Sequence, residues 1–147
     1  MKVMTDDMKL NKNNVLFSVE KMPNTELRYR FKIDDNTIYS VTKSGENYEW
    51  QNSHYHKLCN EVYVVQSGKI IMVTKKDKCV IKKVAKIGDV IAVGPNESHN
   101  LFLSKDAQIC VLKYGNIKSD DWYSDKSLDE FCKSIDVEKI FERYSKI

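Results

Sequence analysis

The chain has 147 residues, of which 41% are hydrophobic and 31% charged, and its 24 basic and 21 acidic side chains leave a formal net charge of +3. This length fits one domain, which on folding buries about two thirds of the surface that the unfolded chain exposes. No stretch is long and apolar enough to cross a bilayer, residues 1–8 break up any signal-peptide pattern, and the charge forms no long basic block. We therefore expect a soluble, cytoplasmic protein that binds neither membranes nor nucleic acid.

Short β-type runs follow one another from about residue 14 to residue 115. Each has the length of a strand and is rich in β-branched or aromatic residues, and turn signals such as Ser67-Gly68 and Gly94-Pro95-Asn96 separate them. The runs cover residues 15–19, 27–33, 37–42, 61–65, 70–74, 79–81, 90–93, 100–103 and 108–112. Many short strands at close, even spacing predict a mainly β protein, either an antiparallel sandwich or a closed barrel.

The pattern changes to a helical one after Gly115. The sequence from Ser127 to Glu130 has the form of a capping box, and the apolar residues that follow have helical spacing. A second apolar set, from Val137 to Tyr144, is out of phase with the first, which predicts a break near Asp136. We expect one domain over residues 1–147, with a barrel at about 14–115 and a C-terminal helical extension at about 116–147 packed on the outside of the barrel.

The four cysteines, Cys59, Cys79, Cys110 and Cys132, are far apart and form no Cys-x-x-Cys pair. This spacing indicates neither a zinc ribbon nor a thioredoxin-like redox site. Reduced, buried thiols are the expected state.

Two of the three histidines form His54-Tyr55-His56, where the period of a strand places both imidazoles on one face. Residues 57–60 can turn the chain, so that Glu61 on the next strand faces the same interior. The third histidine, His99, follows an apolar strand and a Gly-Pro-Asn turn that directs it back over the sheet. Three imidazoles and a carboxylate suit divalent iron, manganese, nickel, cobalt or zinc, and they leave coordination positions open for a ligand.

These residues resemble the two motifs of the cupin superfamily. The spacing His54-x-His56-x4-Glu61-x6-Gly68 is similar to the first motif, and the stretch from Gly88 to His99 is similar to the second. The resemblance covers roughly residues 45–112. It implies a jelly-roll, or double-stranded β-helix, barrel with one divalent metal ion bound inside its wider end by His54, His56, Glu61 and His99.

The chain departs from the cupin pattern at three places. Gly45, the glycine that would open the first motif, lies farther from His54 than is usual, and Pro95-Asn96-Glu97 stands in place of Pro-x-Gly. Leu103 occupies the usual position of an asparagine. None of these differences removes a metal ligand.

Several other side chains are candidates for the pocket. Tyr63 shares the inward face of Glu61 and is the candidate catalytic residue, whereas Trp50 and Asn52 share the face of His54; ordinary core packing is the alternative role for each. Arg28 and Arg30 lie on one face of an early strand, where exposed pairing on a sheet edge is favoured over contact with an anionic substrate. We interpret Cys59 as a turn residue and not as a metal ligand.

The leading hypothesis is a metalloenzyme that acts on a small molecule, as a sugar isomerase or epimerase or as a dioxygenase. The presence of Glu61 argues against the thiol dioxygenases, which resemble this pattern but lack the carboxylate. Two alternatives stay open: a non-catalytic module that binds a sugar or metabolite, and a metal-free epimerase with His56 or His99 as base and Tyr63 as acid. We also expect a homodimer formed through the strands between Val15 and Ile33.

Overall fold

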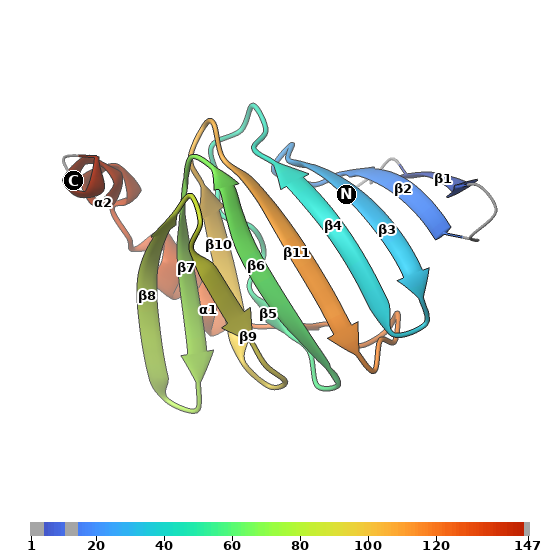
Figure 1. Ribbon diagram of the computed structural model, residues 1–147. Coiled ribbons are helices and arrows are strands. Elements are labelled where there is room, and N and C mark those ends of the chain that lie inside the picture. Colours follow the sequence, from blue (N-terminus) through green and yellow to red (C-terminus); the bar gives the residue numbers. More distant parts are fainter. Residues whose placement is uncertain (1–4, 11–14, 146–147) are drawn as a thin grey trace.

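A computed structural model describes residues 5–10 and 15–145 of the chain, which form two antiparallel sheets and two helices (Figure 1). One sheet has seven strands in the order β1-β2-β3-β4-β11-β6-β9, and the other has five in the order β12-β5-β10-β7-β8. The strands of the first sheet are Thr5–Leu10 (β1), Val15–Lys21 (β2), Leu27–Asp34 (β3), Thr37–Lys43 (β4), Gln108–Gly115 (β11), Cys59–Ser67 (β6) and Val90–Val93 (β9). Those of the second are Tyr123–Ser124 (β12), His54–Tyr55 (β5), Ser98–Leu103 (β10), Lys69–Lys76 (β7) and Cys79–Lys86 (β8). The mainly β jelly roll predicted from the sequence is confirmed.

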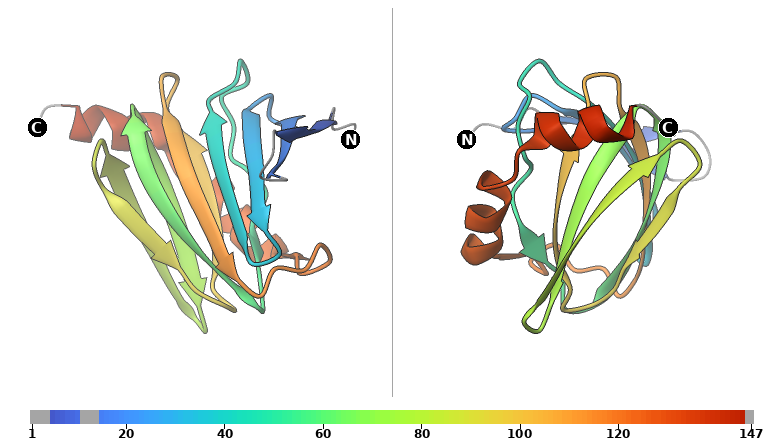
Figure 2. Two further views of the ribbon diagram at one scale, coloured as in Figure 1. Left: turned by 45° about the vertical axis from the view of Figure 1, so that its right-hand side comes forward. Right: turned by 90° about the vertical axis from the view of Figure 1, so that its left-hand side faces the viewer.

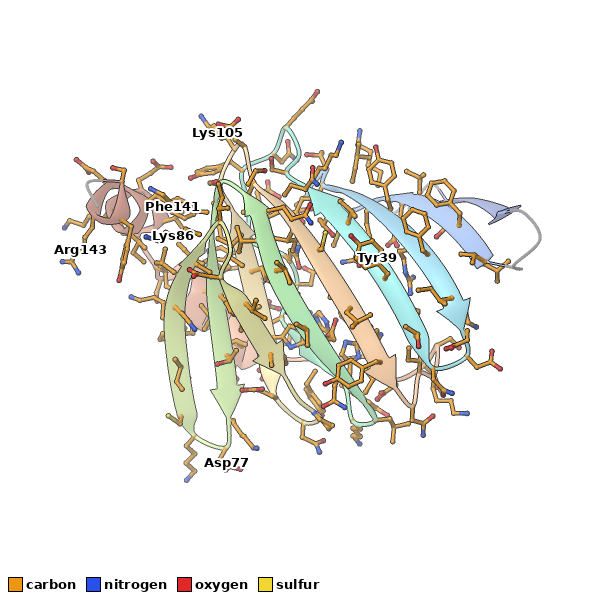
Figure 3. The ribbon with its side chains drawn as sticks, in the orientation of Figure 1. Tyr39, Asp77, Lys86, Lys105, Phe141 and Arg143 are labelled. Atoms are coloured by element: carbon orange, nitrogen blue, oxygen red, sulfur yellow. The ribbon has the colours of Figure 1, made fainter. Side chains whose placement is uncertain are left out.

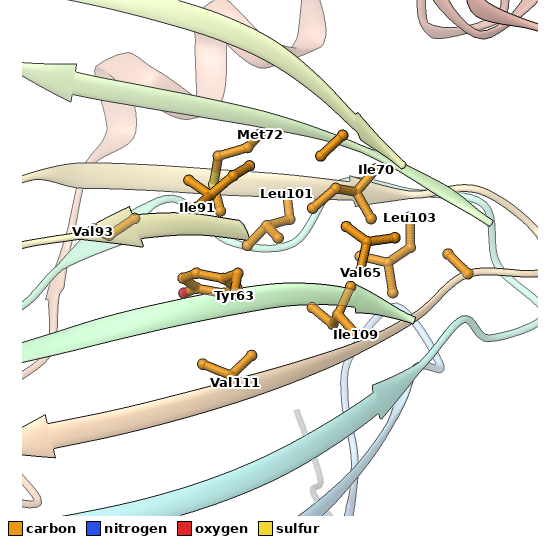
Figure 4. Packing of buried hydrophobic residues seen from close by; sticks show 12 residues of the cluster. Tyr63, Val65, Ile70, Met72, Ile91, Val93, Leu101, Leu103, Ile109 and Val111 are labelled. Atoms are coloured by element: carbon orange, nitrogen blue, oxygen red, sulfur yellow. The ribbon is translucent and has the colours of Figure 1, made fainter. Parts of the chain in front are cut away.

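Alternation along the strands separates an inner face from an outer one. In β6 the inward residues Glu61, Tyr63 and Val65 are buried, as the sequence predicts, while their outward neighbours are half-buried or exposed. The inward apolar side chains of β6 to β11 meet between the sheets in one cluster (Figure 4). Its members are Tyr63, Val65, Ile70, Met72, Ala85, Ile91, Val93, Leu101, Leu103, Ala107, Ile109 and Val111.

The helices Lys126–Lys133 (α1) and Val137–Tyr144 (α2) lie outside the barrel, against the five-stranded sheet (Figure 2). Leu128 and Cys132 of α1 pack against Ile71, Val73 and Phe102 on the outer face of that sheet. The break near Asp136 is confirmed, because Asp136 caps α2. Neither helix in the described part of the chain is both long and apolar enough to cross a membrane.

The predicted capping box is wrong in its first residue. The N-cap of α1 is Asp125, whose carboxylate accepts a hydrogen bond from the Leu128 backbone N–H at 3.0 Å. Ser127 lies inside the first turn, and its hydroxyl donates to the same carboxylate. A carboxylate at the positive end of the helix dipole competes better for this place than a hydroxyl does.

The first strand, β1, has no counterpart among the predicted runs. It pairs with β2 over its whole length, from Thr5 opposite Glu20 to Leu10 opposite Val15. The strands between Val15 and Ile33 therefore do not form the edge of the sheet, and the edge addition that the sequence suggested is not available to them in this arrangement.

Candidate metal centre

The four predicted ligands come together at one point between the sheets. His54 in β5 pairs directly with His99 in β10, His56 follows β5, and Glu61 lies in β6. One ligating atom of each of the four lies within 4.8 Å of those of the other three. The Glu61 Oε1 atom is 3.1 Å from His56 Nε2 and 3.2 Å from His99 Nε2.

The turn before β10 holds the two sequence motifs together. The backbone N–H of Asn96, which has a positive φ of 63°, donates to the His56 carbonyl at 2.6 Å, and the Gly94 N–H donates to the Glu97 carboxylate at 3.0 Å. This turn precedes β10, the strand that carries His99, so the second motif is hydrogen-bonded to the first at His56.

A second set of hydrogen bonds fixes the strands behind the ligands. Ser53, which precedes His54, receives a hydrogen bond on its hydroxyl from the Asn100 amide at 2.8 Å, and Asn100 follows His99. The Ser53 backbone N–H donates to Asp129 of α1 at 2.8 Å. Helix α1 thereby helps to position two of the ligand-bearing segments.

All three imidazoles use the same nitrogen to anchor themselves to the backbone. The Nδ1 atom of His54 is 2.9 Å from the Asn52 carbonyl, that of His99 is 3.1 Å from the Glu97 carbonyl, and that of His56 bonds to the Asp121 carbonyl. A carbonyl oxygen only accepts hydrogen bonds, so each Nδ1 carries a proton. In a ring that carries no second proton, the Nε2 lone pair is then left for a cation, as in metal sites whose histidines are oriented by an outer shell.

The protonation states also suit a cation. Burial, together with the neighbouring His99, lowers the pKa of His54 to about 3, so this ring is neutral at physiological pH. Burial would raise the pKa of Glu61, but positive charge on the imidazoles of His56 and His99 outweighs it and holds that pKa well below its usual range, and a cation bound beside the carboxylate would act in the same direction. Glu61 is therefore a carboxylate.

Two buried atoms of the cluster, Glu61 Oε1 and His99 Nε2, have no hydrogen-bond partner among the residues that the structure describes. They lie 3.2 Å apart, yet with the proton of His99 on Nδ1 both are acceptors. Buried acceptors that face one another without a donor are costly. A divalent cation between them would satisfy both, so the residues present fit the metal ion that the sequence motif implies.

A second group of metal-binding side chain types, His56, Cys59 and Asp121, lies beside the first. Here the Asp121 carboxylate already accepts hydrogen bonds from the backbone N–H groups of Lys57 at 2.8 Å and Leu58 at 3.0 Å. Burial raises the pKa of the Cys59 thiol to about 11, so the thiolate that a metal needs is disfavoured. We interpret this group as support for His56. Cys59 begins strand β6 and is not the turn residue that the sequence suggested.

Sequence reasoning missed two residues that shape the centre, Asp121 and Trp122. Asp121 fixes the ring of His56 and the two residues that follow it. The ring of Trp122 stacks on His54 with centroids 5.2 Å apart and an interplanar angle of 20°. Both lie in the irregular segment after β11, which carries no local motif that would connect it with the histidines.

A cavity of about 510 Å³ contains the exposed side of the cluster. Its wall includes His54, His56 and Glu61, and also Tyr63 and Asn52, as the sequence suggested. Trp50 is elsewhere: it packs edge-on against Phe102 beneath the helices, with ring centroids 5.3 Å apart. The face that Trp50 was predicted to share with His54 ends before β5 begins.

Arg28 and Arg30 also line this cavity, so the prediction that they pair at an exposed sheet edge is wrong. Strand β3 lies between β2 and β4, and the inward direction of its alternate residues carries both guanidinium groups toward the cavity. They do form ion pairs, each with Glu20 at 4.0 Å, but inside the barrel.

Tyr63 lies at the junction of the cavity and the apolar cluster. It is buried, and its ring centroid is 5.9 Å from that of His99. Burial and the adjacent Glu61 carboxylate raise the pKa of Tyr63 well above its ordinary value. The phenol therefore keeps its proton and can donate a hydrogen bond, but the raised pKa opposes the full transfer of that proton which the predicted role of acid requires.

A second cavity, of about 650 Å³, lies between α2 and loops at one end of the sheets. Lys86, Lys105 and Phe141, which line it, lie close together in that region (Figure 3). Among the described residues, none that lines it also lines the cavity that contains His54, His56 and Glu61.

Solved structures of similar architecture identify the fold. A cupin described as RmlC-like, from Shewanella frigidimarina, superposes with a TM-score of 0.58 at 14% identity, covering 82% of this chain and 98% of its own. The protein has the cupin fold. KdgF from Halomonas sp. gives a TM-score of 0.54 at 13% identity over 78% of this chain and 89% of KdgF. Oxalate oxidase in complex with the substrate analogue glycolate gives a TM-score of 0.55 at 12% identity over 65% of this chain and 53% of the oxidase.

These likenesses are in three-dimensional structure alone. No protein-family model and no curated protein matches the sequence. The activity of this protein must therefore be argued from its own site.

Proposed function

We propose that this cupin is a metal-dependent enzyme that acts on a small molecule bound in the 510 Å³ cavity. One observation carries the proposal: three imidazoles anchored through Nδ1 lie around a buried carboxylate, and Glu61 Oε1 and His99 Nε2, which face each other there, have no hydrogen-bond partner in the described part of the chain. The cavity has the volume that binding sites for small molecules usually have. One member of the same fold, oxalate oxidase, is an enzyme, as its name states.

His54, His56, Glu61 and His99 would hold the metal, as iron, manganese, nickel, cobalt or zinc in the divalent state. When bound, such a cation supplies Lewis-acid polarisation of a ligand oxygen, or redox chemistry if it is iron or manganese. The chain itself supplies the remaining functions. Tyr63 holds a proton at its phenol oxygen on the wall of the cavity, and Trp122 covers the face of His54 and limits its contact with water.

The reaction that we favour is isomerisation or epimerisation of a sugar, or oxidation of a small organic acid. Both need an oxygen of the substrate beside the cluster and a hydrogen-bond donor nearby, which Tyr63 provides. Consumption of dissolved oxygen by the metal-loaded protein would indicate oxidation, whereas exchange of a substrate C–H proton with solvent deuterium would indicate isomerisation.

Metal content tests the proposal directly. We expect purified protein to contain close to one equivalent of a first-row metal, and chelation to abolish turnover. Less than about a tenth of an equivalent, with activity retained after chelation, would favour the metal-free epimerase instead. Bound metal with no turnover on sugars and small acids would favour a binding module.

We also propose a homodimer and a cytoplasmic location, which rest on sequence reasoning. The outer face of β2 to β4 supports the dimer, because the half-buried rings of Phe17, Phe31 and Tyr39 lie there in a row with centroids 5.0 and 6.0 Å apart. Apolar patches of this kind often mark interfaces. A single species of 17.1 kDa in light scattering at micromolar concentration would rule the dimer out.

A further inference from the structure

The four metal ligands lie on two parts of the fold that are held in different ways. Glu61 belongs to β6, which pairs with both β9 and β11, and His99 belongs to β10, which pairs with β7 over all six of its residues. His54 and His56 belong to the segment 53–58, whose strand β5 is two residues long and pairs with β10 only where His54 lies opposite His99. The long strands of the barrel therefore fix Glu61 and His99, whereas His54 and His56 depend on other contacts.

Residues 121–125, which we call the strap, supply these contacts through hydrogen bonds. The strap contains β12, which pairs with β5 over both of its residues and forms the edge of the five-stranded sheet. At one end of the strap, the backbone N–H of Asp125 donates to the Ser53 carbonyl at 2.9 Å. At the other end, the Asp121 carboxylate accepts the backbone N–H groups of residues 57 and 58. The strap is thus bonded to the ligand-bearing segment along its whole length.

Aromatic rings reinforce the contact between the strap and segment 53–58. Trp122 stacks on the ring of His54, and Tyr123 stacks on the ring of Tyr55 with centroids 5.2 Å apart and an interplanar angle of 20°. The Nζ atom of Lys57 lies 4.4 Å from the centre of the Tyr123 ring. Displacing the strap would therefore release both histidines of the segment from the contacts that orient them.

The two ends of the strap differ in how firmly they are attached. Asp125 is anchored, because it caps α1 and forms an ion pair with Lys75. The connector before the strap, residues 116–120, contains no buried side chain, and within the described part of the chain no hydrogen bond joins it to either sheet. In the strap itself Asp121 alone is buried, and Trp122 is 48% exposed. Segments with few buried side chains open at low free-energy cost while the core stays folded, so we expect the strap to open from the connector side.

The strap and its connector also form part of the wall of the metal cavity. Ile117, Lys118 and Ser119 of the connector and Asp121 and Trp122 of the strap line this cavity, together with three of the four metal ligands. Opening of the strap would widen the cavity and release two ligands in one movement.

A bound cation would tie the two parts of the ligand set together. On the barrel side, Glu61 Oε1 and His99 Nε2 have no hydrogen-bond partner among the described residues, and ligating atoms of His54 and His56 lie within 4.8 Å of those of Glu61 and His99. A cation held from both sides binds the closed strap more tightly than the open one, and a ligand that prefers one state shifts the equilibrium toward it. By the same linkage, a change that opens the strap weakens binding of the cation.

We propose that closure of the strap and metal binding form one coupled equilibrium, in which Asp121 and Trp122 are positioning residues for His56 and His54. The strap is closed when the metal is bound, and the metal leaves when the strap opens. The inference rests on the metal site of the proposed function but not on turnover.

Hydrogen exchange of the whole protein, with and without Mn²⁺, tests the coupling. The amides of Lys57 and Leu58, which donate to Asp121, report opening of the strap together with the amides of residues 122–124. At a Mn²⁺ concentration about a hundred times its Kd, opening that requires release of the metal becomes about a hundredfold rarer, so these amides should exchange about a hundredfold more slowly. Strand β8, at the opposite edge of the same sheet, is the control and should change less than about twofold. Slowing of less than about threefold around the strap, with Mn²⁺ bound, would overturn the proposal.

Variants of Trp122 separate positioning from packing. Trp122→Ala removes the ring that stacks on His54 but no ligating atom. We expect faster exchange of the strap in the metal-free variant and a Mn²⁺ affinity about tenfold lower, as for other residues that orient ligands. Trp122→Phe, which keeps a ring against His54, should recover most of that affinity, and Tyr144→Ala, at an aromatic side chain 41% exposed on α2, should change neither quantity. Unchanged Mn²⁺ affinity in folded Trp122→Ala would contradict the proposal.

The exchange measurement on the wild type decides the proposal if Trp122→Ala does not fold, and it separates the strap from the enzyme. Slower strap exchange with Mn²⁺ but no turnover on sugars or small acids would keep the strap and reject the metalloenzyme. Turnover that requires Mn²⁺, with strap exchange unchanged, would do the reverse. A protein that binds none of the divalent ions of manganese, iron, cobalt, nickel or zinc would overturn both.

Discussion

The inward face of the seven-stranded sheet has two parts with opposite chemistry. On β6, β9 and β11 it supplies apolar side chains to the central cluster, whereas on β2 to β4 it carries Glu20, Arg28, Arg30, Ser40 and Thr42. In the described part of the chain the apolar cluster contains no residue of β1 to β4. The same alternation thus builds a core in one half of the barrel and the wall of a hydrated cavity in the other.

The outer face reverses this distribution. Tyr39 and Val41, the outward neighbours of Ser40, are half-buried and apolar, and Phe31 lies beside Tyr39. An ordinary half-buried sheet is apolar inside and polar outside. We therefore expect the core half to determine stability and the cavity half to determine binding. Each of the following predictions tests that division.

Leu103→Ala should cause the largest loss of stability. Leu103 is 3% exposed and packs in the apolar cluster near Ile70, Val65 and Ile109 (Figure 4). Truncating a buried leucine leaves a cavity, so we expect a loss of about 3–4 kcal/mol in the free energy of unfolding, measured by urea denaturation. Metal affinity of the folded variant should stay within about twofold of the wild type. Ile87→Ala, at a side chain 68% exposed, is the control and should cost less than about 0.5 kcal/mol.

Glu61→Gln should have the opposite profile. It removes one of four ligands, so metal affinity should fall at least a hundredfold, or about 2.7 kcal/mol. Metal-free Glu61→Gln should be as stable as the wild type or up to about 1 kcal/mol more stable, because the glutamine amide can donate to the Nε2 atoms that Glu61 Oε1 faces. Glu130→Gln, on the exposed side of α1, should change neither quantity. A marked loss of stability in metal-free Glu61→Gln would show that the cluster also holds the fold together.

Glu26→Gln should show how much the burial of the Glu26 carboxyl group lowers the free energy of unfolding. Glu26 lies at the edge of the cavity half. Glu26 is 2% exposed and accepts a hydrogen bond from Gln51 at 2.7 Å; burial, the main cause, raises its pKa from 4.5 to about 7. The folded state therefore holds a proton that the unfolded state has lost, and stability falls as pH rises from 4.5 through 7. At pH 8 we expect Glu26→Gln to be about 2 kcal/mol more stable than the wild type.

The pH dependence provides the check on Glu26. In urea denaturation the difference between Glu26→Gln and the wild type should shrink below about 1 kcal/mol at pH 5, where Glu26 is protonated in the folded protein. Glu46→Gln, at an exposed loop position, should show no such dependence. A difference that stays the same at both pH values would mean that Glu26 is not the group that titrates.

The sequence predicted the core half and the convergence of His54, His56, Glu61 and His99 well because both follow local rules. Alternation and strand length locate the nine runs, and the spacing of His54, His56 and Glu61 needs only the period of a strand and one turn. His99 is the third histidine of three, and the turn before it indicates its direction. These features depend on neighbours in the sequence, so pattern reasoning reaches them.

The cavity wall was less predictable because it depends on which strands are neighbours in space. From the sequence alone, Arg28 and Arg30 look like residues of an edge strand. Their face is an inner one because β1 covers β2 and β4 pairs with β11. The same applies to the cap of α1, where Asp125 and Ser127 compete within one turn and tertiary contacts decide. Lys75 forms an ion pair with Asp125 at 2.6 Å, a contact between β7 and the helix that no local pattern contains.

Asp121→Asn should give the smallest effect of these variants. It tests whether Asp121 only supports the loop or also contributes to metal binding. Asp121 contacts no cavity ligand in our proposals, but its carboxylate accepts the N–H groups of Lys57 and Leu58 and its backbone accepts from His56. Asparagine keeps the backbone contact and one acceptor oxygen, so we expect metal affinity to fall about five- to tenfold, at the lower end of the range for residues that orient ligands, or about 1 kcal/mol.

The position of Asp121 gives this last prediction its discriminating power. If Asp121 only stabilised the loop, Asp121→Asn would lower the free energy of unfolding and leave the metal affinity of the folded protein unchanged. If Asp121 also orients His56, Asp121→Asn should weaken Mn²⁺ binding by the folded protein. Asp120→Asn, at the exposed neighbouring position, should change neither stability nor Mn²⁺ affinity. A loss of stability in Asp121→Asn with unchanged Mn²⁺ affinity would show that Asp121 supports the loop and does not orient the ligand.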